Sequence, residues 1–141
     1  YKPKQDKDWE LLLTKLTQLI DEFHSATMGN TVVNIGDNKP IQRYFYLDVE
    51  DPQSYLAAFN KYQKYRPKDR QVLLGGFSAG RSPDGETHWI IIGFDDMKSA
   101  MDAGAYRMNN AQAQKAWDEY GKNRGETRLV RSGLRIMLGN W

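Results

Sequence analysis

The chain has 141 residues, of which 40% are hydrophobic and 27% are charged, and its formal net charge at pH 7 is +2. This length suits a single domain with a complete core, and so small a net charge does not by itself indicate a nucleic-acid partner. The lack of cysteine excludes disulfides, a thiol nucleophile and cysteine-ligated clusters. No apolar run approaches the length of a membrane span, so we expect a soluble protein without a membrane partner.

The chain begins at Tyr1 rather than at Met. This start fits a mature exported protein as well as a cytoplasmic one, so the sequence assigns no compartment. We expect residues 1–40 to form an N-terminal helix and connector that pack on a main domain at 41–141. The helix is predicted for 8–25, where apolar residues recur at helical spacing after a capping Asp8.

The main domain is expected to begin with a strand and a helix. The connector before it contains one short candidate strand, at 31–35. Residues 41–49 are rich in aromatic and β-branched side chains, which favour a strand. Asp51 and Pro52 then form a typical helix start, with Asp at the N-cap and Pro at the first helical position, and the helix is predicted to end near Lys64.

Residues 71–95 predict a β-hairpin, which is the clearest local signal in the chain. Pro83 presets the backbone for a type I turn, and Asp84 and Gly85 suit the positions that follow it. The isoleucines at 90–92 form helices poorly and strands well. The hairpin is therefore expected to form the centre of a sheet.

The rest of the chain predicts two helical segments and a closing strand. Asp95 or Asp96 is expected to cap the first segment, and Asn110 the second, which would end at Gly121. Alternating side chains predict the last strand at 126–138. From residue 41 the order is thus strand, helix, strand, strand, helix, strand. We predict an α+β fold, a ferredoxin-like split βαβ sandwich with an antiparallel four-stranded sheet and an extra N-terminal helix.

The two phases of the predicted strands differ in their expected environment. The phase expected to face the helices contains Phe45, Leu47, Val49, Ile90, Ile92, Phe94, Leu134, Ile136 and Leu138. The opposite phase contains Tyr44, Tyr46, Trp89, Ile91, Leu129, Arg131, Arg135 and Met137. A sheet face in water does not usually carry so many aromatic and aliphatic groups. We therefore expect a cover on this face, either a second subunit in a homodimer or the N-terminal helix.

The segment HWIIIGFDD at 88–96, followed by a helix-rich middle at 97–121 and a closing strand, resembles the dimeric α+β barrel superfamily. That superfamily includes antibiotic-biosynthesis-type monooxygenases and stress-responsive barrel proteins, and the resemblance covers residues 41–139. It implies two sheets paired face to face and small molecules held between sheet and helices. It also implies two candidate activities, a cofactor-independent monooxygenase and a haem-handling enzyme.

His88 is the one histidine in a predicted strand, and it is the candidate catalytic residue. Imidazole titrates near neutral pH, so His88 suits a general base or a haem ligand, although a structural role is the simpler interpretation. The candidate ligand-binding residues are Tyr44, Tyr46, Trp89, Arg131 and Arg135. The aromatic rings would stack on a ligand and an arginine would pair with its carboxylate or phenolate, unless the same groups form a dimer interface.

Two motifs resemble nucleotide or nucleic-acid sites but lack the required context. Residues 75–82 imitate a phosphate-binding loop, but Arg81 replaces its lysine and Pro83 follows where the helix should begin. The run at 61–70 alternates basic residues with tyrosines, but the RNA-binding pattern of ferredoxin-like domains is absent. We therefore expect no nucleic-acid partner, and no residue spacing predicts a metal site.

The sequence supports three functional hypotheses. The first is a homodimeric ferredoxin-like protein that binds a small apolar or aromatic molecule. The second is an enzyme of the monooxygenase or haem-handling type, with His88 near the substrate. The third is a structural or interaction module. The sequence names no cofactor and no substrate.

Overall fold

The computed structural model describes residues 10–11, 14–15, 18, 28–78, 82 and 84–138. The helix predicted for 8–25 lies mostly outside the described residues, and so does Pro83 of the predicted turn.

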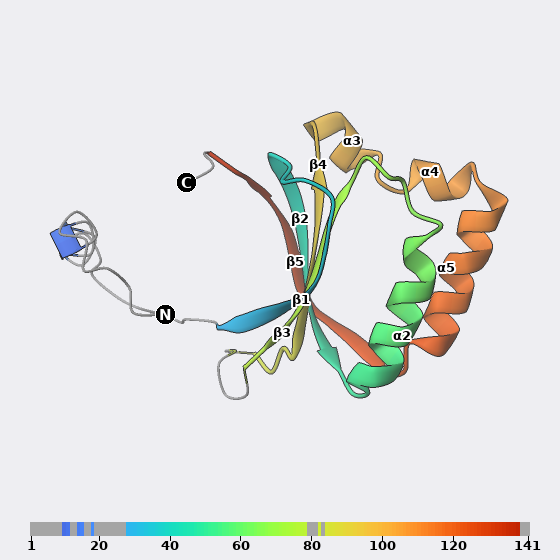
Figure 1. Ribbon diagram of the computed structural model, residues 1–141, viewed down its shortest axis with the longest axis horizontal. Helices are drawn as coiled ribbons and strands as arrows, with labels where there is room; N and C mark the ends of the chain where they lie inside the picture. Colours follow the sequence, from blue (N-terminus) through green and yellow to red (C-terminus); the bar gives the residue numbers. More distant parts are fainter. Residues whose placement is uncertain are drawn as a thin grey trace.

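The described part of the chain is an α+β fold with a five-stranded antiparallel sheet. The strands are β1 (Gly29–Ile35), β2 (Ile41–Val49), β3 (Gln71–Phe77), β4 (His88–Phe94) and β5 (Thr127–Ile136). The helices are α2 (Pro52–Gln63), α3 (Met97–Met101), α4 (Ala105–Met108) and α5 (Ala111–Asn123). The strand order is β1-β3-β4-β2-β5, and these four helices lie on one side of the sheet (Figure 1).

The prediction of four strands is wrong, because β1 adds a fifth. It pairs antiparallel with β3 along its whole length, with a register shift between Thr31 and Val33. Without β1, the backbone groups along one side of β3 would form an unpaired sheet edge. The candidate strand at 31–35 is therefore part of β1 and of the sheet.

The predicted helix starts are confirmed by their hydrogen bonds. Asp51 and Asp96 accept from backbone N–H groups of the first turn of α2 and α3, and Asn110 does the same for α5. The predicted end of α5 is wrong, because the helix continues past Gly121. Its termination falls at Gly125, where φ is +73°, a conformation that glycine adopts readily.

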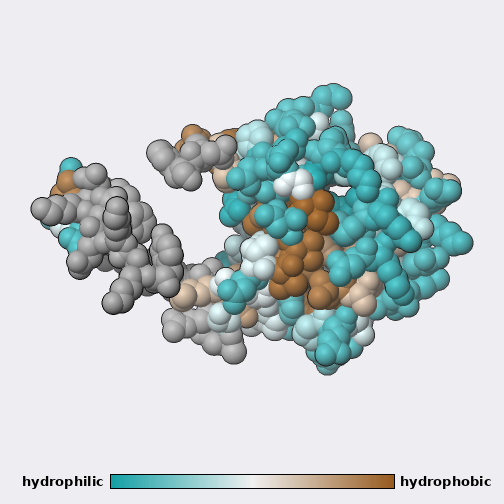
Figure 2. All heavy atoms as spheres, viewed as in Figure 1, coloured by the Kyte–Doolittle hydropathy of each residue, from teal (hydrophilic) through white to brown (hydrophobic). Residues whose placement is uncertain are grey.

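The core lies between the sheet and the pair α2 and α5, on the strand phase predicted to face the helices. Its main buried cluster contains Leu47, Val49, Tyr55, Ala58, Phe59, Val72, Leu74 and Tyr120. Apolar residues form a band in the middle of the molecule, beside the hydrophilic helical layer (Figure 2). The strands β2, β3 and β4 therefore carry most of the core.

Strand β5 differs from the prediction in two ways. Its register against β2 shifts between Tyr46 and Leu47, so that Leu129 pairs with Leu47 and lies on the helix side, not on the opposite one. Leu134 and Ile136 were expected in the core but are 39% and 54% exposed, and Leu138 beyond the strand is also exposed. The reason is that α5 packs on α2 and does not cover β5.

Candidate functional site: a pocket between sheet and helices

A pocket of about 400 Å³ lies between the helix-facing side of the sheet and the helices. Its walls come from β2, β4 and β5, from α2, α4 and α5, and from the segments 66–70 and 103–104. The volume falls within the range of about 300–1,000 Å³ that is typical of small-molecule sites. A smaller hollow of about 230 Å³ lies between α2 and α5, and both acidic and basic side chains line it.

Aromatic side chains form the helical wall of the pocket. The ring centroids of Tyr62 and Trp117 are 5.4 Å apart, and those of Trp117 and Tyr120 are 5.3 Å apart. The buried Tyr120 hydroxyl donates a hydrogen bond to the Tyr55 hydroxyl at 2.8 Å. Burial raises the pKa of both tyrosines, so both hydroxyls stay neutral near pH 7. Together with Phe45 and the isoleucines of β4, these rings give the pocket a largely apolar surface.

Five arginines also line the pocket: Arg43, Arg66, Arg70, Arg107 and Arg124. No aspartate or glutamate is among the described lining residues. Three of the guanidinium groups lie over rings of the same pocket. The distances from guanidinium carbon to ring centroid are 4.4 Å for Arg107 and Trp117, 5.4 Å for Arg43 and Phe45, and 5.6 Å for Arg124 and Tyr120.

Arg66 is the most buried of these arginines, with 8% of its surface exposed. Its Nη1 donates to Gln63 Oε1 at 3.0 Å. Burial, together with the positive charge of Arg70, lowers the pKa of Arg66 to about 10. Arg70 donates to the Ala103 carbonyl at 3.0 Å, which ties the segment before β3 to the turn between α3 and α4. Both side chains remain charged at neutral pH, with Arg66 largely removed from water and Arg70 half-buried.

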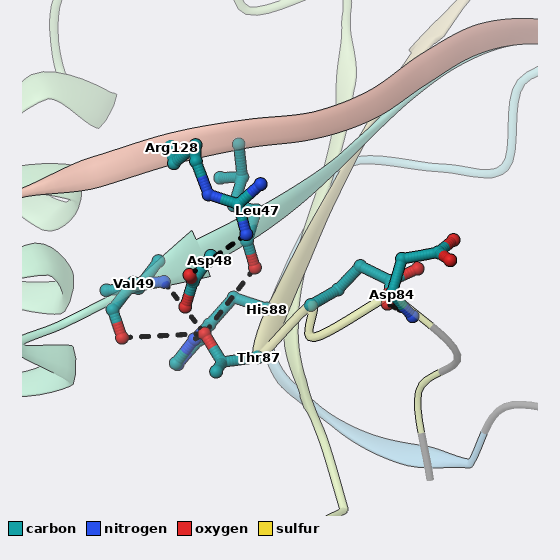
Figure 3. Close-up of polar contacts among 8 residues, drawn as sticks. Leu47, Asp48, Val49, Asp84, Thr87, His88 and Arg128 are labelled. Atoms are coloured by element: carbon teal, nitrogen blue, oxygen red, sulfur yellow. Dashed lines mark hydrogen bonds and ion pairs between the residues drawn. The ribbon is translucent and has the colours of Figure 1, made fainter.

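His88 lies on the helix-facing side of β4, as its strand phase predicts, but outside the lining of the pocket. Its ring centroid is 6.1 Å from that of Tyr55. The Thr87 hydroxyl accepts from the Val49 N–H at 2.8 Å and lies 2.9 Å from His88 Nδ1 (Figure 3). This hydroxyl also donates toward the carbonyls of Leu47 and Val49, at 3.4 and 3.5 Å. The catalytic role of His88 stays a prediction.

The predicted ligand-binding residues lie on the opposite face of the sheet, which we call the open face. Tyr44 and Tyr46 lie with ring centroids 5.2 Å apart, and the Arg131 guanidinium is 4.7 Å from the Tyr46 ring. Arg131 also pairs with the buried Glu86 at 2.9 Å. Trp89 lies close against Gly75 of the neighbouring strand. These four predicted residues therefore share a face with one another but not with the pocket.

Arg135 lies farther along the open face and is engaged in a network of amides. Its Nε donates to Gln42 Oε1 at 2.9 Å, and Gln42 Nε2 donates to Gln71 Oε1 at 3.2 Å. Gln71 Nε2 in turn donates to Asn38 Oδ1 at 2.7 Å. Arg135 thus orders the buried amides beneath it, and its role toward a ligand stays a prediction.

Sequence reasoning missed the pocket arginines. Arg66 and Arg70 lie after the predicted end of the helix at Lys64, in a stretch at 65–70 that the sequence predicts as a basic link to the hairpin. Arg43 lies in the helix-facing phase of β2, where a charged residue among apolar ones was the available signal. Arg107 and Arg124 reach the same pocket from distant segments, and only the fold brings them together.

The fold and the site define an α+β protein with a pocket that is lined by arginine and aromatic side chains. Comparison with known proteins finds no matching family, no matching curated protein and no matching solved structure. Among the described residues, no helix is long and apolar enough to cross a membrane. The described part of the chain also contains no group of three or more His, Cys, Asp or Glu side chains arranged to hold a metal ion.

Proposed function

We propose that the protein binds a small apolar or aromatic molecule in the pocket between sheet and helices. The observation that carries this proposal is the lining itself, in which Phe45, Tyr62, Trp117 and Tyr120 surround a volume of about 400 Å³. Pockets of this size and chemistry enclose most of the surface of a drug-sized ligand. The exposed Leu129 on β5 extends the apolar lining toward solvent and offers a route of entry.

We further propose a ferredoxin-like arrangement related to the dimeric α+β barrels. The strand order β3-β4-β2-β5 supports it, because this is the order that a split βαβ unit produces, with β1 as an added edge strand. Binding between sheet and helices is also what the resemblance to that superfamily implies.

A homodimer through the open face is the second part of this proposal. The open face carries the aromatic side chains of Tyr44, Tyr46, Phe77 and Trp89, with Tyr46 and Phe77 in edge contact at 5.2 Å. A two-fold axis would place this surface against its own copy. Native mass spectrometry tests it directly. We expect twice the monomer mass of 16.3 kDa, and a clean monomer at micromolar concentration would refute the dimer.

Pocket binding is tested with N-phenyl-1-naphthylamine, a neutral dye that fluoresces in apolar sites. Gly104 lines the pocket, and a Cβ atom added there would have no heavy atom within 4 Å. We therefore expect Gly104→Trp to fill the pocket and to abolish the fluorescence increase. Gly121→Trp is the matched control, because Gly121 has the same free space but lies outside the pocket. Equal fluorescence in both variants would refute the proposed site.

A further inference from the structure

We infer that the ligand of this pocket is an anion, a small molecule with an aromatic or apolar body and a carboxylate or similar oxyanion. The inference rests on the proposed function and specifies its ligand class. It is carried by the arrangement of the five pocket arginines and by the absence of acidic side chains among the described lining residues.

The pairing of arginines differs between the pocket and the rest of the described chain. Outside the pocket, Arg128 pairs with Asp48 at 3.2 Å and Arg131 pairs with Glu86 at 2.9 Å. Arg135 is held by a glutamine. Within the described residues, none of the five pocket arginines forms an ion pair. Among the described residues, Arg128 and Arg131 therefore have carboxylate partners, whereas no carboxylate lies within ion-pair distance of the five pocket arginines.

Burial makes these charges costly, although the carboxylate of Asp69 offsets part of the charge of Arg70. Arg66 is buried and Arg70 is half-buried, and each makes one hydrogen bond to a neutral oxygen. A guanidinium group has five N–H donors, so most of its capacity in each case is not used by the described residues. An oxyanion in the pocket would accept charge-assisted hydrogen bonds from these donors and offset the charge.

The contact between Arg107 and Trp117 leaves this capacity intact, because it brings the cation to an aromatic ring and uses no N–H donor. One site thus combines apolar surface for the body of a ligand with several donors for an anionic group. A neutral apolar ligand would use the first and not the second.

The test compares 2-naphthoate with 2-naphthamide by isothermal titration calorimetry, because the two share a ring system and differ in charge. We expect the wild-type protein to bind 2-naphthoate at least about tenfold more tightly, as charge-assisted hydrogen bonds allow. Arg66→Gln should weaken 2-naphthoate binding about tenfold and leave 2-naphthamide binding unchanged. Arg107→Gln, at a less buried position, should act in the same direction. Arg128→Gln is the matched control outside the pocket and should change neither affinity.

The outcomes distinguish a failure of the anion inference from a failure of the proposed pocket binding. Equal affinities of the wild-type protein for both compounds would overturn the anion inference and leave pocket binding in place. Binding of neither compound, together with no dye response in the wild-type protein, would overturn the proposed function itself. Unchanged 2-naphthoate affinity in folded Arg66→Gln and Arg107→Gln would also overturn the inference, because these guanidinium groups would not contact the anion.

Discussion

Arg66 is a charged residue in a position that an apolar residue would usually occupy. It is 8% exposed, and among the described residues it donates a hydrogen bond to Gln63. A positive charge removed from water without an anionic partner destabilises the folded state. Retaining such a residue makes sense if it serves binding, since functional sites commonly reduce stability.

Arg66→Met should therefore stabilise the protein in the absence of ligand. Methionine keeps much of the side-chain volume and removes the buried charge, so we expect the free energy of unfolding to rise by about 1 kcal/mol. Urea denaturation at pH 7 measures the change. The control Arg128→Met breaks an exposed ion pair and should change stability by less than about 1 kcal/mol. A loss of stability in Arg66→Met would contradict the account.

His88 should make stability depend on pH. Burial lowers its pKa below the ordinary value of 6.5. In the unfolded chain His88 takes up a proton near pH 6.5, whereas in the folded protein it does so only at lower pH. The unfolded state therefore binds more protons in this range, and stability must fall as pH decreases from 6.5 toward the folded pKa.

We expect His88→Gln to lose less stability than the wild type between pH 7 and pH 5. Urea denaturation at several pH values gives the slope. His24→Gln removes the other of the two histidines and should keep the His88 contribution. Identical slopes in His88→Gln and wild type would show that burial does not perturb this imidazole.

At the scale of elements, the packing of α2 against α5 depends on two tyrosines that are hydrogen-bonded to each other. The hydroxyls of Tyr55 and Tyr120 are buried and form the 2.8 Å hydrogen bond between the two helices. Removing either hydroxyl takes this partner from the other, which stays buried. We expect Tyr55→Phe and Tyr120→Phe each to cost about 1–2 kcal/mol of stability.

The double variant Tyr55→Phe/Tyr120→Phe should cost less than the sum of the single changes, because no unpaired hydroxyl remains. Urea denaturation of the four proteins completes the cycle. Tyr62→Phe, in the same aromatic cluster, is the control for a hydroxyl outside this pair. Strict additivity would mean that the two hydroxyls do not interact.

Two adjacent glycines of β3 should respond differently to substitution. A side-chain carbon at Gly75 would lie 2.2 Å from the Trp89 ring and 2.6 Å from the Asn30 carbonyl oxygen. At Gly76 the nearest heavy atom would be 3.7 Å away. We expect Gly75→Ala to cost about 2 kcal/mol or more and Gly76→Ala to be nearly neutral. Similar thermal unfolding of the two variants would contradict the close packing of β1, β3 and β4.

Local chemistry made most elements predictable from the sequence. The caps at Asp51, Asp96 and Asn110 act within a few residues, so their sequence signals determine where the helices start. The shift of Leu129 to the helix side depends on a register change between two distant strands, for which the sequence has no local signal. The place of β1 in the sheet likewise depends on tertiary pairing with β3.

At the scale of the whole molecule, the pocket is a product of topology. Arg43, Arg66 and Arg107 are far apart in the chain and converge because the helices lie against one side of the sheet (Figure 1). The sequence indicated a small-molecule site but directed attention to the aromatic residues of the open face. The period of two residues predicts which side chains share a face of a strand. It does not predict a pocket whose walls come from several elements.

The central claim is that the ligand site is the pocket and not the open face, and the two tryptophans of these surfaces distinguish them. Trp117 lines the pocket, and Trp89 belongs to the open face. The most direct measurement is a ¹H–¹⁵N NMR titration with 2-naphthoate that follows the indole N–H signals, assigned with Trp117→Phe and Trp89→Phe. The account predicts a saturable shift of the Trp117 signal while Trp89 stays unchanged. A shift of Trp89 with Trp117 unchanged would contradict it and place the ligand on the open face.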